Sequence, residues 1–152
     1  MTERETLEVI FPTWLPRPTI PVTVVCGPPG SGKTTYVAQH ADEFDLVIDV
    51  DVIAADLFGL PLYRANKEQR LEAVRHRNKL LARLADDPCP HARAWLIVTA
   101  GTAFSRDFWR SRYGNMIVLD TPKHECIRRV LADKRRLEVM KFSVIKSIRA
   151  WR

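Results

Sequence analysis

The chain contains four short apolar runs, and most of them are followed by apolar residues that recur at helical spacing. These runs are Val22–Cys26, Leu46–Val50, Trp95–Thr99 and Met116–Leu119. Their apolar residues are continuous rather than alternating, which is typical of parallel strands covered on both faces. The pattern predicts an α/β fold: a three-layer sandwich with a mostly parallel sheet of four to five strands and helices on both faces.

Helices are predicted between these strands from apolar residues that recur every three or four positions. The clearest covers residues 66–85, where an apolar stripe follows a capping pair of Asn66 and Gln69. Shorter helices are predicted to begin near Lys33 and near Ser105.

The two ends of the chain carry weaker signals. Residues 1–21 predict a short strand at Leu7–Phe11 and a proline-rich connector. Residues 121–140 predict a lid-like helix, and residues 141–152 a basic C-terminal tail. The tail is predicted to dock on the domain as an amphipathic helix, with a nucleic-acid or partner-protein surface as the alternative. We expect residues 1–152 to form a single domain.

Composition excludes several protein classes. The chain is 46% hydrophobic and 28% charged, as in ordinary globular domains. No apolar run approaches the ~20 residues of a membrane span, and the polar start does not fit a secretory signal. Cys26, Cys89 and Cys126 lack the paired spacing of a disulfide framework or a zinc site. We therefore expect a cytoplasmic protein with no membrane partner.

Positive charge is concentrated late in the chain. The net charge is +6, and residues 101–152 hold 13 of the 24 Lys and Arg residues but 5 of the 18 Asp and Glu residues. This asymmetry predicts an anionic partner, such as a nucleotide, a nucleic acid or an anionic lipid.

Residues 27–34 match the pattern G-x-x-x-x-G-K-[ST] without exception. Its glycines allow the backbone to bring amide groups against phosphate oxygens, and the helix that follows directs its positive dipole end at the same anion. A strand before the loop and a helix after it are the context that confirms this motif. The sequence therefore predicts a P-loop NTPase. The residues expected to bind ATP are Gly27, Pro28, Pro29, Gly30, Ser31, Gly32, Lys33, Thr34 and Thr35.

Two residues of this loop have specific predicted roles. Lys33 is expected to contact the β- and γ-phosphates, and the Thr34 hydroxyl to bind Mg²⁺. GTP is disfavoured, because Asn66–Gln69 departs from a guanine-recognising Asn-Lys-x-Asp segment at its last position. A mechanical ATPase is disfavoured as well, because the third strand ends without an acid and Asp120, after the fourth, has no adjacent Glu.

Two acidic residues close the second predicted strand. Asp49 and Asp51 lie where parallel sheets bind ligands, at the carboxyl ends of the strands, and in an extended segment they point to the same side. A kinase needs a carboxylate there to accept the proton of the acceptor hydroxyl. Asp51 is the first candidate for this role and Asp49 a candidate Mg²⁺ ligand, although the roles are interchangeable at this point. Solvated turn residues are the alternative interpretation.

Together, the loop and the acidic strand end resemble the small P-loop kinases of the polynucleotide kinase and zeta-toxin type, over residues 20–140. The resemblance implies a late lid helix whose arginines close on the phosphates. The candidates here are Arg128, Arg129 and Arg135. It also implies that ATP and Mg²⁺ are used to phosphorylate a nucleic-acid 5′ hydroxyl or a small nucleoside or nucleotide. The alternative is an ATP-binding accessory protein or ATPase that works with a nucleic-acid-processing machine.

Overall fold

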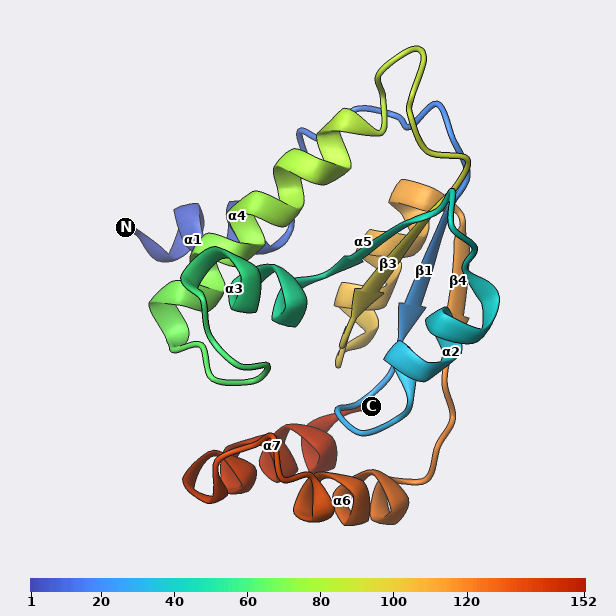
Figure 1. Ribbon diagram of the computed structural model, residues 1–152. Coiled ribbons are helices and arrows are strands. Elements are labelled where there is room, and N and C mark those ends of the chain that lie inside the picture. Colours follow the sequence, from blue (N-terminus) through green and yellow to red (C-terminus); the bar gives the residue numbers. More distant parts are fainter.

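Four parallel strands form the centre of the computed structural model, which describes residues 1–152 (Figure 1). The order β2-β3-β1-β4 places β1 and β3 inside the sheet, and every neighbouring pair is parallel. This confirms the predicted α/β class and the parallel sheet. The strands are β1 (Val22–Cys26), β2 (Leu46–Asp49), β3 (Ala94–Val98) and β4 (Asn115–Val118).

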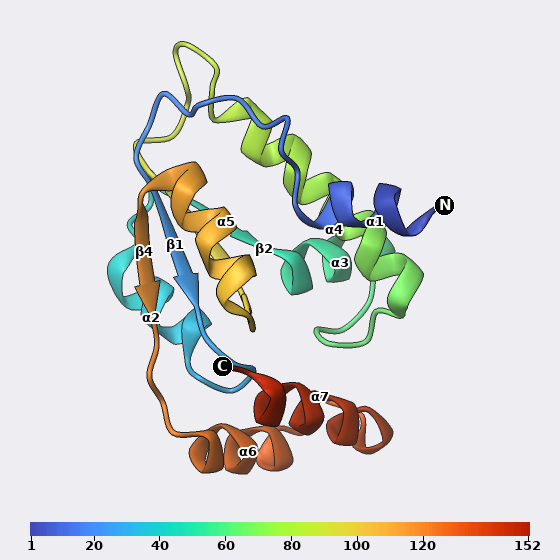
Figure 2. The same ribbon diagram turned by 180° about the vertical axis from the view of Figure 1, so that it is seen from behind.

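Helices cover both faces of this sheet. Figure 1 shows α2 in front of the strands, and Figure 2, from behind, shows α5 on the opposite face. In both views α6 and α7 lie beyond the carboxyl ends of β1 and β4. No helix is long and apolar enough to cross a membrane. The helices are α1 (Glu3–Ile10), α2 (Lys33–His40), α3 (Val50–Phe58), α4 (Lys67–Arg83), α5 (Ala103–Tyr113), α6 (Lys123–Ala132) and α7 (Glu138–Ala150).

The core is built around the two inner strands. Val24, Val25 and Leu96 are completely buried. On one face Val24 and Leu96 belong to a cluster with residues of α4 and α5, and on the other Val25 packs with Val37 of α2. Burying each such side chain stabilises the fold by about 1.5–3 kcal/mol. This core fixes the level at which the strands end, and hence the position of the segments that follow them.

The predicted strand at Leu7–Phe11 is wrong, because Glu3–Ile10 form helix α1. A capping box starts this helix: the Thr2 hydroxyl accepts a hydrogen bond from the Glu5 amide at 3.1 Å, and the Glu5 carboxylate accepts one from the Thr2 amide. The weak alternation of residues 7–11 therefore does not produce a strand, and the sheet has four strands rather than five.

The second strand ends one residue earlier than predicted, and an unpredicted helix follows it. Asp49 is the last residue of β2 and the N-cap of α3, where its Oδ1 accepts a hydrogen bond from the Asp51 amide at 2.9 Å. Helix α4 starts as predicted, at a capping box of Asn66 and Gln69. Helix α5, predicted to begin near Ser105, begins at Ala103 and is capped by Thr102.

Residues 121–140, predicted as one lid-like helix, belong to two helices. Helix α6 ends at Ala132 and α7 begins at Glu138. Between them, Asp133 Oδ1 accepts a hydrogen bond from the Arg135 amide at 3.0 Å. Such a side-chain contact offers the backbone an alternative to helical hydrogen bonds, so the chain turns here.

Residues 141–152, predicted as a basic C-terminal tail, lie in α7 except for the last two. The end of the chain is bound to the segment that follows β3: Trp151 Nε1 donates to the Thr99 carbonyl at 2.9 Å, and the Arg152 amide to the Gly101 carbonyl at 3.1 Å. This agrees with the predicted docking as an amphipathic helix. A partner-protein surface on this segment stays a prediction.

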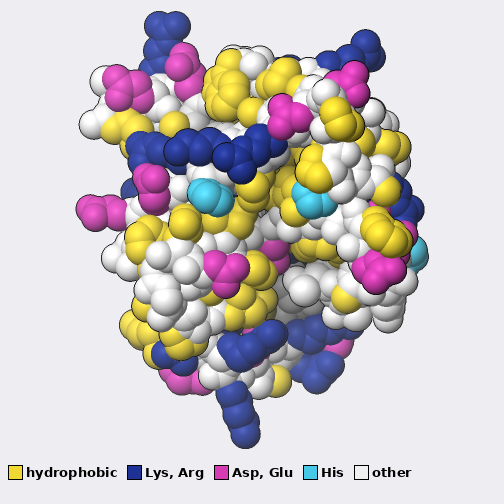
Figure 3. Space-filling view, turned by 45° about the horizontal axis from the view of Figure 1, so that its top comes forward, with side chains coloured by type: hydrophobic (Ala, Val, Ile, Leu, Met, Phe, Trp, Pro, Cys, Tyr) yellow, Lys and Arg dark blue, Asp and Glu magenta, His cyan; other side chains and the backbone are white.

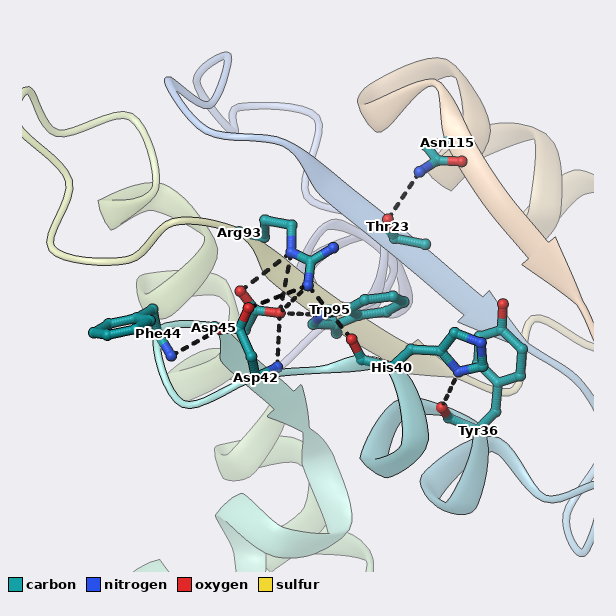
Figure 4. Close-up of polar contacts among 9 residues, drawn as sticks. All are labelled: Thr23, Tyr36, His40, Asp42, Phe44, Asp45, Arg93, Trp95 and Asn115. Carbon is teal, nitrogen blue, oxygen red and sulfur yellow. Dashed lines mark hydrogen bonds and ion pairs between the residues drawn. The ribbon is translucent and has the colours of Figure 1, made fainter.

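A buried carboxylate joins the loop before β2 to the start of β3 (Figure 4). The Asp45 side chain is fully enclosed and accepts hydrogen bonds from Trp95 Nε1 at 2.9 Å and Arg93 Nε at 3.1 Å. Burial favours the neutral acid, but these hydrogen bonds prevail and lower the pKa of Asp45 below its ordinary value. Figure 4 also shows Asn115 of β4 donating to the Thr23 hydroxyl of β1, at 2.8 Å.

We predict that Asp45→Asn lowers the free energy of unfolding at pH 7 by about 1–3 kcal/mol, because a charged acceptor is lost and an amide NH₂ faces the donors. A lowered pKa means that this contribution is complete above the unfolded pKa of about 3.9 and is lost as pH falls through the folded pKa. Urea unfolding at pH 7 and pH 3 measures both values, and the difference between the proteins should shrink at pH 3.

Asp42→Asn is the matched control, because Asp42 pairs with the same Arg93 at 3.5 Å but is 57% exposed. Its effect should stay within about 1 kcal/mol. Equal losses for the two variants would contradict the importance assigned to the enclosed carboxylate.

Candidate active site

A large cleft lies at the carboxyl ends of the strands, with a volume of about 1560 Å³. Parallel strands end at the same edge, so the segments that follow β1, β2 and β3 meet there. Helices α6 and α7 line the opposite side. Figure 3 shows one face of the molecule, hollowed near its middle, with Lys and Arg side chains gathered at its upper and lower ends. On this face the positive charge does not form one continuous band.

The loop between β1 and α2 requires glycine on conformational and steric grounds. Gly30 and Gly32 have φ angles of +79° and +95°, in the left-handed region. A Cβ on Gly30 would also lie 2.6 Å from the Cys126 carbonyl oxygen, in α6. The glycine pattern of the sequence thus reflects both backbone conformation and close packing against α6.

Backbone donors converge at this loop. The amides of Gly30, Gly32, Lys33 and Thr34 donate no hydrogen bond to another protein group. The last two belong to the first turn of α2, where the helix dipole is positive. Unsatisfied amides at a helix N-terminus are a ready-made anion site. The loop therefore fits the phosphates of a nucleotide.

Lys33 lies inside this loop. Its Nζ donates hydrogen bonds to the carbonyl of Gly27 at 2.8 Å and to that of Pro28 at 3.0 Å. Burial lowers the pKa of Lys33 to about 8, although Asp51 and Asp49 oppose the change by attracting the charged form. The Lys33 ammonium is therefore partly desolvated. If phosphate oxygens replaced its two carbonyl partners, they would supply the negative charge that it lacks.

The residues predicted to hold Mg²⁺ share the cleft. Thr34 and Asp49 both line it, and the Thr34 hydroxyl makes no hydrogen bond within the protein. No group of three or more His, Cys, Asp or Glu side chains is arranged to hold a metal ion. At phosphate-transfer sites, Mg²⁺ is usually bound by one or two protein oxygens together with nucleotide phosphates and waters. The Thr34 hydroxyl and the Asp49 carboxylate match this arrangement.

The acidic pair also lies in the cleft, but not as an extended segment. Asp51 is in the first turn of α3, and its Oδ1 accepts a hydrogen bond from Arg70 Nη1 at 2.6 Å. Burial and the nearby Asp51 charge raise the pKa of Asp49. The two carboxylates therefore differ, because Asp51 pairs with Arg70, whereas ionised Asp49 is stabilised first by the hydrogen bond from the Asp51 amide and then by Lys33.

Helix α6 rests directly on the phosphate loop. Arg129 Nη1 donates to the Gly30 carbonyl at 3.1 Å. Arg128 also lines the cleft, but its guanidinium donates two hydrogen bonds to Glu125, at 2.5 and 2.8 Å. The hydrogen bond from Arg128, together with Arg129, lowers the pKa of Glu125 to about 2. Arg129 is thus the predicted lid arginine in direct contact with the loop.

The turn between α6 and α7 contacts the opposite wall of the cleft. Arg135, the third predicted lid arginine, pairs with Asp133 at 2.9 Å, and its carbonyl accepts a hydrogen bond from Arg64 Nε at 3.0 Å. The Arg136 guanidinium lies 3.8 Å from the centre of the Tyr63 ring. These contacts join the α6–α7 turn to the segment that precedes α4.

The structure brings most of the predicted site residues together. Gly27 and Pro28 do not line the cleft, although their carbonyls hold Lys33. The predicted site residues that line it are Pro29, Gly30, Ser31, Gly32, Lys33, Thr34, Thr35, Asp49, Asp51, Arg128, Arg129 and Arg135.

Sequence reasoning missed Tyr63 and Arg70. Tyr63 has a φ of 66°, which no local pattern indicates. Arg70 is detectable only once the cleft-facing side of α4 is known. Arg106, on α5, donates a hydrogen bond to the Ala100 carbonyl at 2.8 Å and does not line the cleft.

Comparison with known proteins agrees with this geometry. The AAA domain family AAA_33 matches residues 22–151. The chain belongs to this family. No curated protein matches it. The match shows a P-loop domain, whereas the narrower resemblance to polynucleotide kinases and zeta toxins stays a prediction.

Two solved structures resemble this AAA_33 domain. One is shikimate kinase from Acinetobacter baumannii in complex with shikimate, with 22% identity, a TM-score of 0.51, and coverage of 86% of this chain and 74% of that chain. The other is TT1252 from Thermus thermophilus, with 22% identity, a TM-score of 0.55, and coverage of 90% and 82%. At this identity the likeness shows the fold alone.

We predict that nucleotide binding weakens above pH 8, because only the protonated form of Lys33 attracts phosphate and its pKa is about 8. Well above pH 8, the Kd for the nucleotide should rise about tenfold for each pH unit. Titrations with a fluorescent ATP analogue between pH 7.5 and 9.5 measure it. The control is Lys33→Arg, which stays charged and should give a flat profile. A flat profile for the wild-type protein would contradict the proposed state of Lys33.

Proposed function

We propose that this protein is an ATP- and Mg²⁺-dependent phosphotransferase. It transfers the γ-phosphoryl group of ATP to a hydroxyl of a nucleic-acid 5′ end or of a small nucleoside or nucleotide. The observation that carries the proposal is one cleft that holds the half-buried P-loop lysine and two carboxylates at the end of β2, a strand separated from β1 by β3. A phosphate loop alone would fit any NTPase, but carboxylates at this edge fit a reaction with an acceptor hydroxyl.

The loop side of the cleft would hold the nucleotide. The amides at the start of α2 would bind phosphate oxygens, and Lys33 would bridge the β- and γ-phosphates. Thr34 and Asp49 would hold Mg²⁺, which neutralises charge on the phosphates when bound. The attraction of Lys33 for the ionised Asp49 opposes the rise in its pKa that burial and Asp51 cause.

The carboxylate side would hold the acceptor. The acceptor hydroxyl oxygen would form a bond to the γ-phosphorus, while the bond to the β–γ bridging oxygen breaks and ADP leaves. Asp51 would accept the hydroxyl proton, and its 2.6 Å hydrogen bond from Arg70 would hold it in place. Arg129, on the loop, would stabilise charge on the transferring group, and Arg128 and Arg135 would assist from the other side.

We predict that Asp51→Asn retains ATP binding but lowers phosphoryl transfer by about 10²–10⁴-fold, because the amide cannot accept the proton. Lys33→Ala should lose both nucleotide binding and transfer. The assay uses γ-labelled ATP with 5′-hydroxyl DNA, 5′-hydroxyl RNA, nucleosides and nucleoside monophosphates, and follows the labelled product.

Asp56→Asn is the matched control on α3, because Asp56 is exposed and lies outside the cleft. It should keep wild-type transfer. Full transfer by both Asp51→Asn and Asp49→Asn would overturn the assigned mechanism. Free phosphate from the wild-type protein, with no labelled acceptor, would instead support an accessory ATPase.

A further inference from the structure

The cleft continues past the carboxylates along one face of helix α4. Arg70, Val74 and Arg77 all line it, at positions i, i+4 and i+7. This spacing places them on one side of the helix, with the two arginines separated by about 10 Å along its axis. Phe11 and Trp109 line the same part of the cleft from other elements. Beyond the carboxylates, the cleft therefore has apolar walls and a second arginine.

Arg77 is a buried cation bound only by neutral groups. It is 5% exposed, and it forms no ion pair with a carboxylate. Its Nε and Nη2 donate to the side-chain oxygen of Asn78 at 3.1 and 2.9 Å, and Nη2 also donates to the Ile10 carbonyl at 3.1 Å. The guanidinium lies 4.9 Å from the centre of the Trp109 ring.

Another buried cation shows the usual arrangement. Lys141 is 4% exposed, and its ammonium pairs with the Glu138 carboxylate at 2.6 Å. Buried charges are normally paired in this way, because an isolated charge in a low-dielectric environment is costly. Burial of Arg77 accordingly lowers its pKa to about 10. Within the protein, Arg77 has no compensating anion.

One end of the Arg77 guanidinium is free to bind a ligand. A guanidinium has five N–H donors, and the hydrogen bonds to Asn78 and Ile10 leave the two on Nη1 unused. Three fully enclosed side-chain nitrogen or oxygen atoms lack a hydrogen-bond partner: Ser31 Oγ, Tyr113 OH and Arg136 Nε. Arg77 Nη1 also lacks a partner but is not one of these three, so it is not sealed inside the protein. The hydrogen bonds of Nε and Nη2 are explained by a structural role, because they hold α1 against α4. This role does not explain why Nη1 has no partner in a residue that lines the cleft.

We propose that Arg77 binds an anionic group of the phosphoryl acceptor, so that the acceptor is a small hydroxylated molecule bearing a carboxylate or a phosphate. The inference rests on the proposed phosphoryl transfer and concerns the acceptor side of the same site: it favours a nucleotide over a neutral nucleoside and adds small hydroxy acids to the acceptors. The hydroxyl would lie beside Asp51, the anion would lie at Nη1 of Arg77, and the apolar walls would enclose the part between them. Both anions present the paired oxygens that a guanidinium binds.

The binding test does not depend on catalysis. The wild-type protein, saturated with Mg²⁺ and ADP to fill the phosphate loop, is titrated with inorganic phosphate and with acetate. Side-chain ¹H–¹⁵N spectra of the arginines provide the readout, and Arg77→Lys identifies the Arg77 signal by its loss. We expect the Arg77 signal to move in a saturable way, while that of Arg75 stays unchanged. Arg75 is the internal control, because it lies on the same helix, paired with Glu72 at 3.0 Å and outside the cleft.

The transfer test compares matched acceptors with γ-labelled ATP: a nucleoside with its monophosphate, and a polyol with the corresponding hydroxy acid. We expect label in the anionic member of a pair, and the pair that is labelled distinguishes phosphate from carboxylate. Arg77→Lys should raise KM for that acceptor at least tenfold with little change in kcat or in ATP binding. Arg75→Lys should match the wild-type protein.

The outcomes separate the two proposals. Equal labelling of neutral and anionic acceptors, or an Arg77 signal that does not respond to either anion, would overturn the role of Arg77. A saturable Arg77 response with no labelled acceptor of any kind would support the anion site and overturn the phosphotransferase proposal. Because the spectra are recorded on the wild-type protein, loss of folding in a variant cannot mimic either result.

Discussion

The parallel alignment of β1 between β3 and β4 is the constraint on which the rest of the structure depends. Together with the parallel pairing of β2 and β3, it brings the phosphate loop, the acidic end of β2 and the end of β3 to one edge, although 71 residues lie between Cys26 and Val98 in the sequence. The same alignment sends the chain from β4 directly into α6, whose Cys126 carbonyl lies against Gly30. The parallel direction of the strands therefore determines which segments of the chain line the cleft.

Two of the cations that line the cleft lie at its opposite ends, with an acidic pair between them. Lys33 lies at the loop end and Arg77 at the far end, and burial lowers the pKa of both. Asp49 and Asp51 partly offset the first, whereas the second has no acid of its own. Such a distribution favours ligands with negative charge at both ends and a polar group at the centre, which matches the two substrates of a phosphoryl transfer held end to end.

The sequence was sufficient for features that are local and insufficient for those that depend on packing. Residues 27–34 carry the whole phosphate loop in one contiguous stretch, and the capping box at Asn66 fixes the start of α4 in the same way. Arg77 could not be assigned because its significance comes from Ile10 and Trp109, which are distant in sequence. The strand at Leu7–Phe11 was mispredicted because apolar alternation over so few residues is weaker than a complete capping box.

The attachment of α6 and α7 determines how the cleft can open. The helix pair is held at one end by the Gly30 contact of Arg129 and at the other by Trp151 on the Thr99 carbonyl, so it is attached to the rest of the domain on both sides. The opposite wall is joined to the same helix pair, because Arg64 Nε donates to the Arg135 carbonyl at 3.0 Å and the Arg136 guanidinium lies 3.8 Å from the centre of the Tyr63 ring. Opening the cleft at this wall therefore requires these two contacts to break.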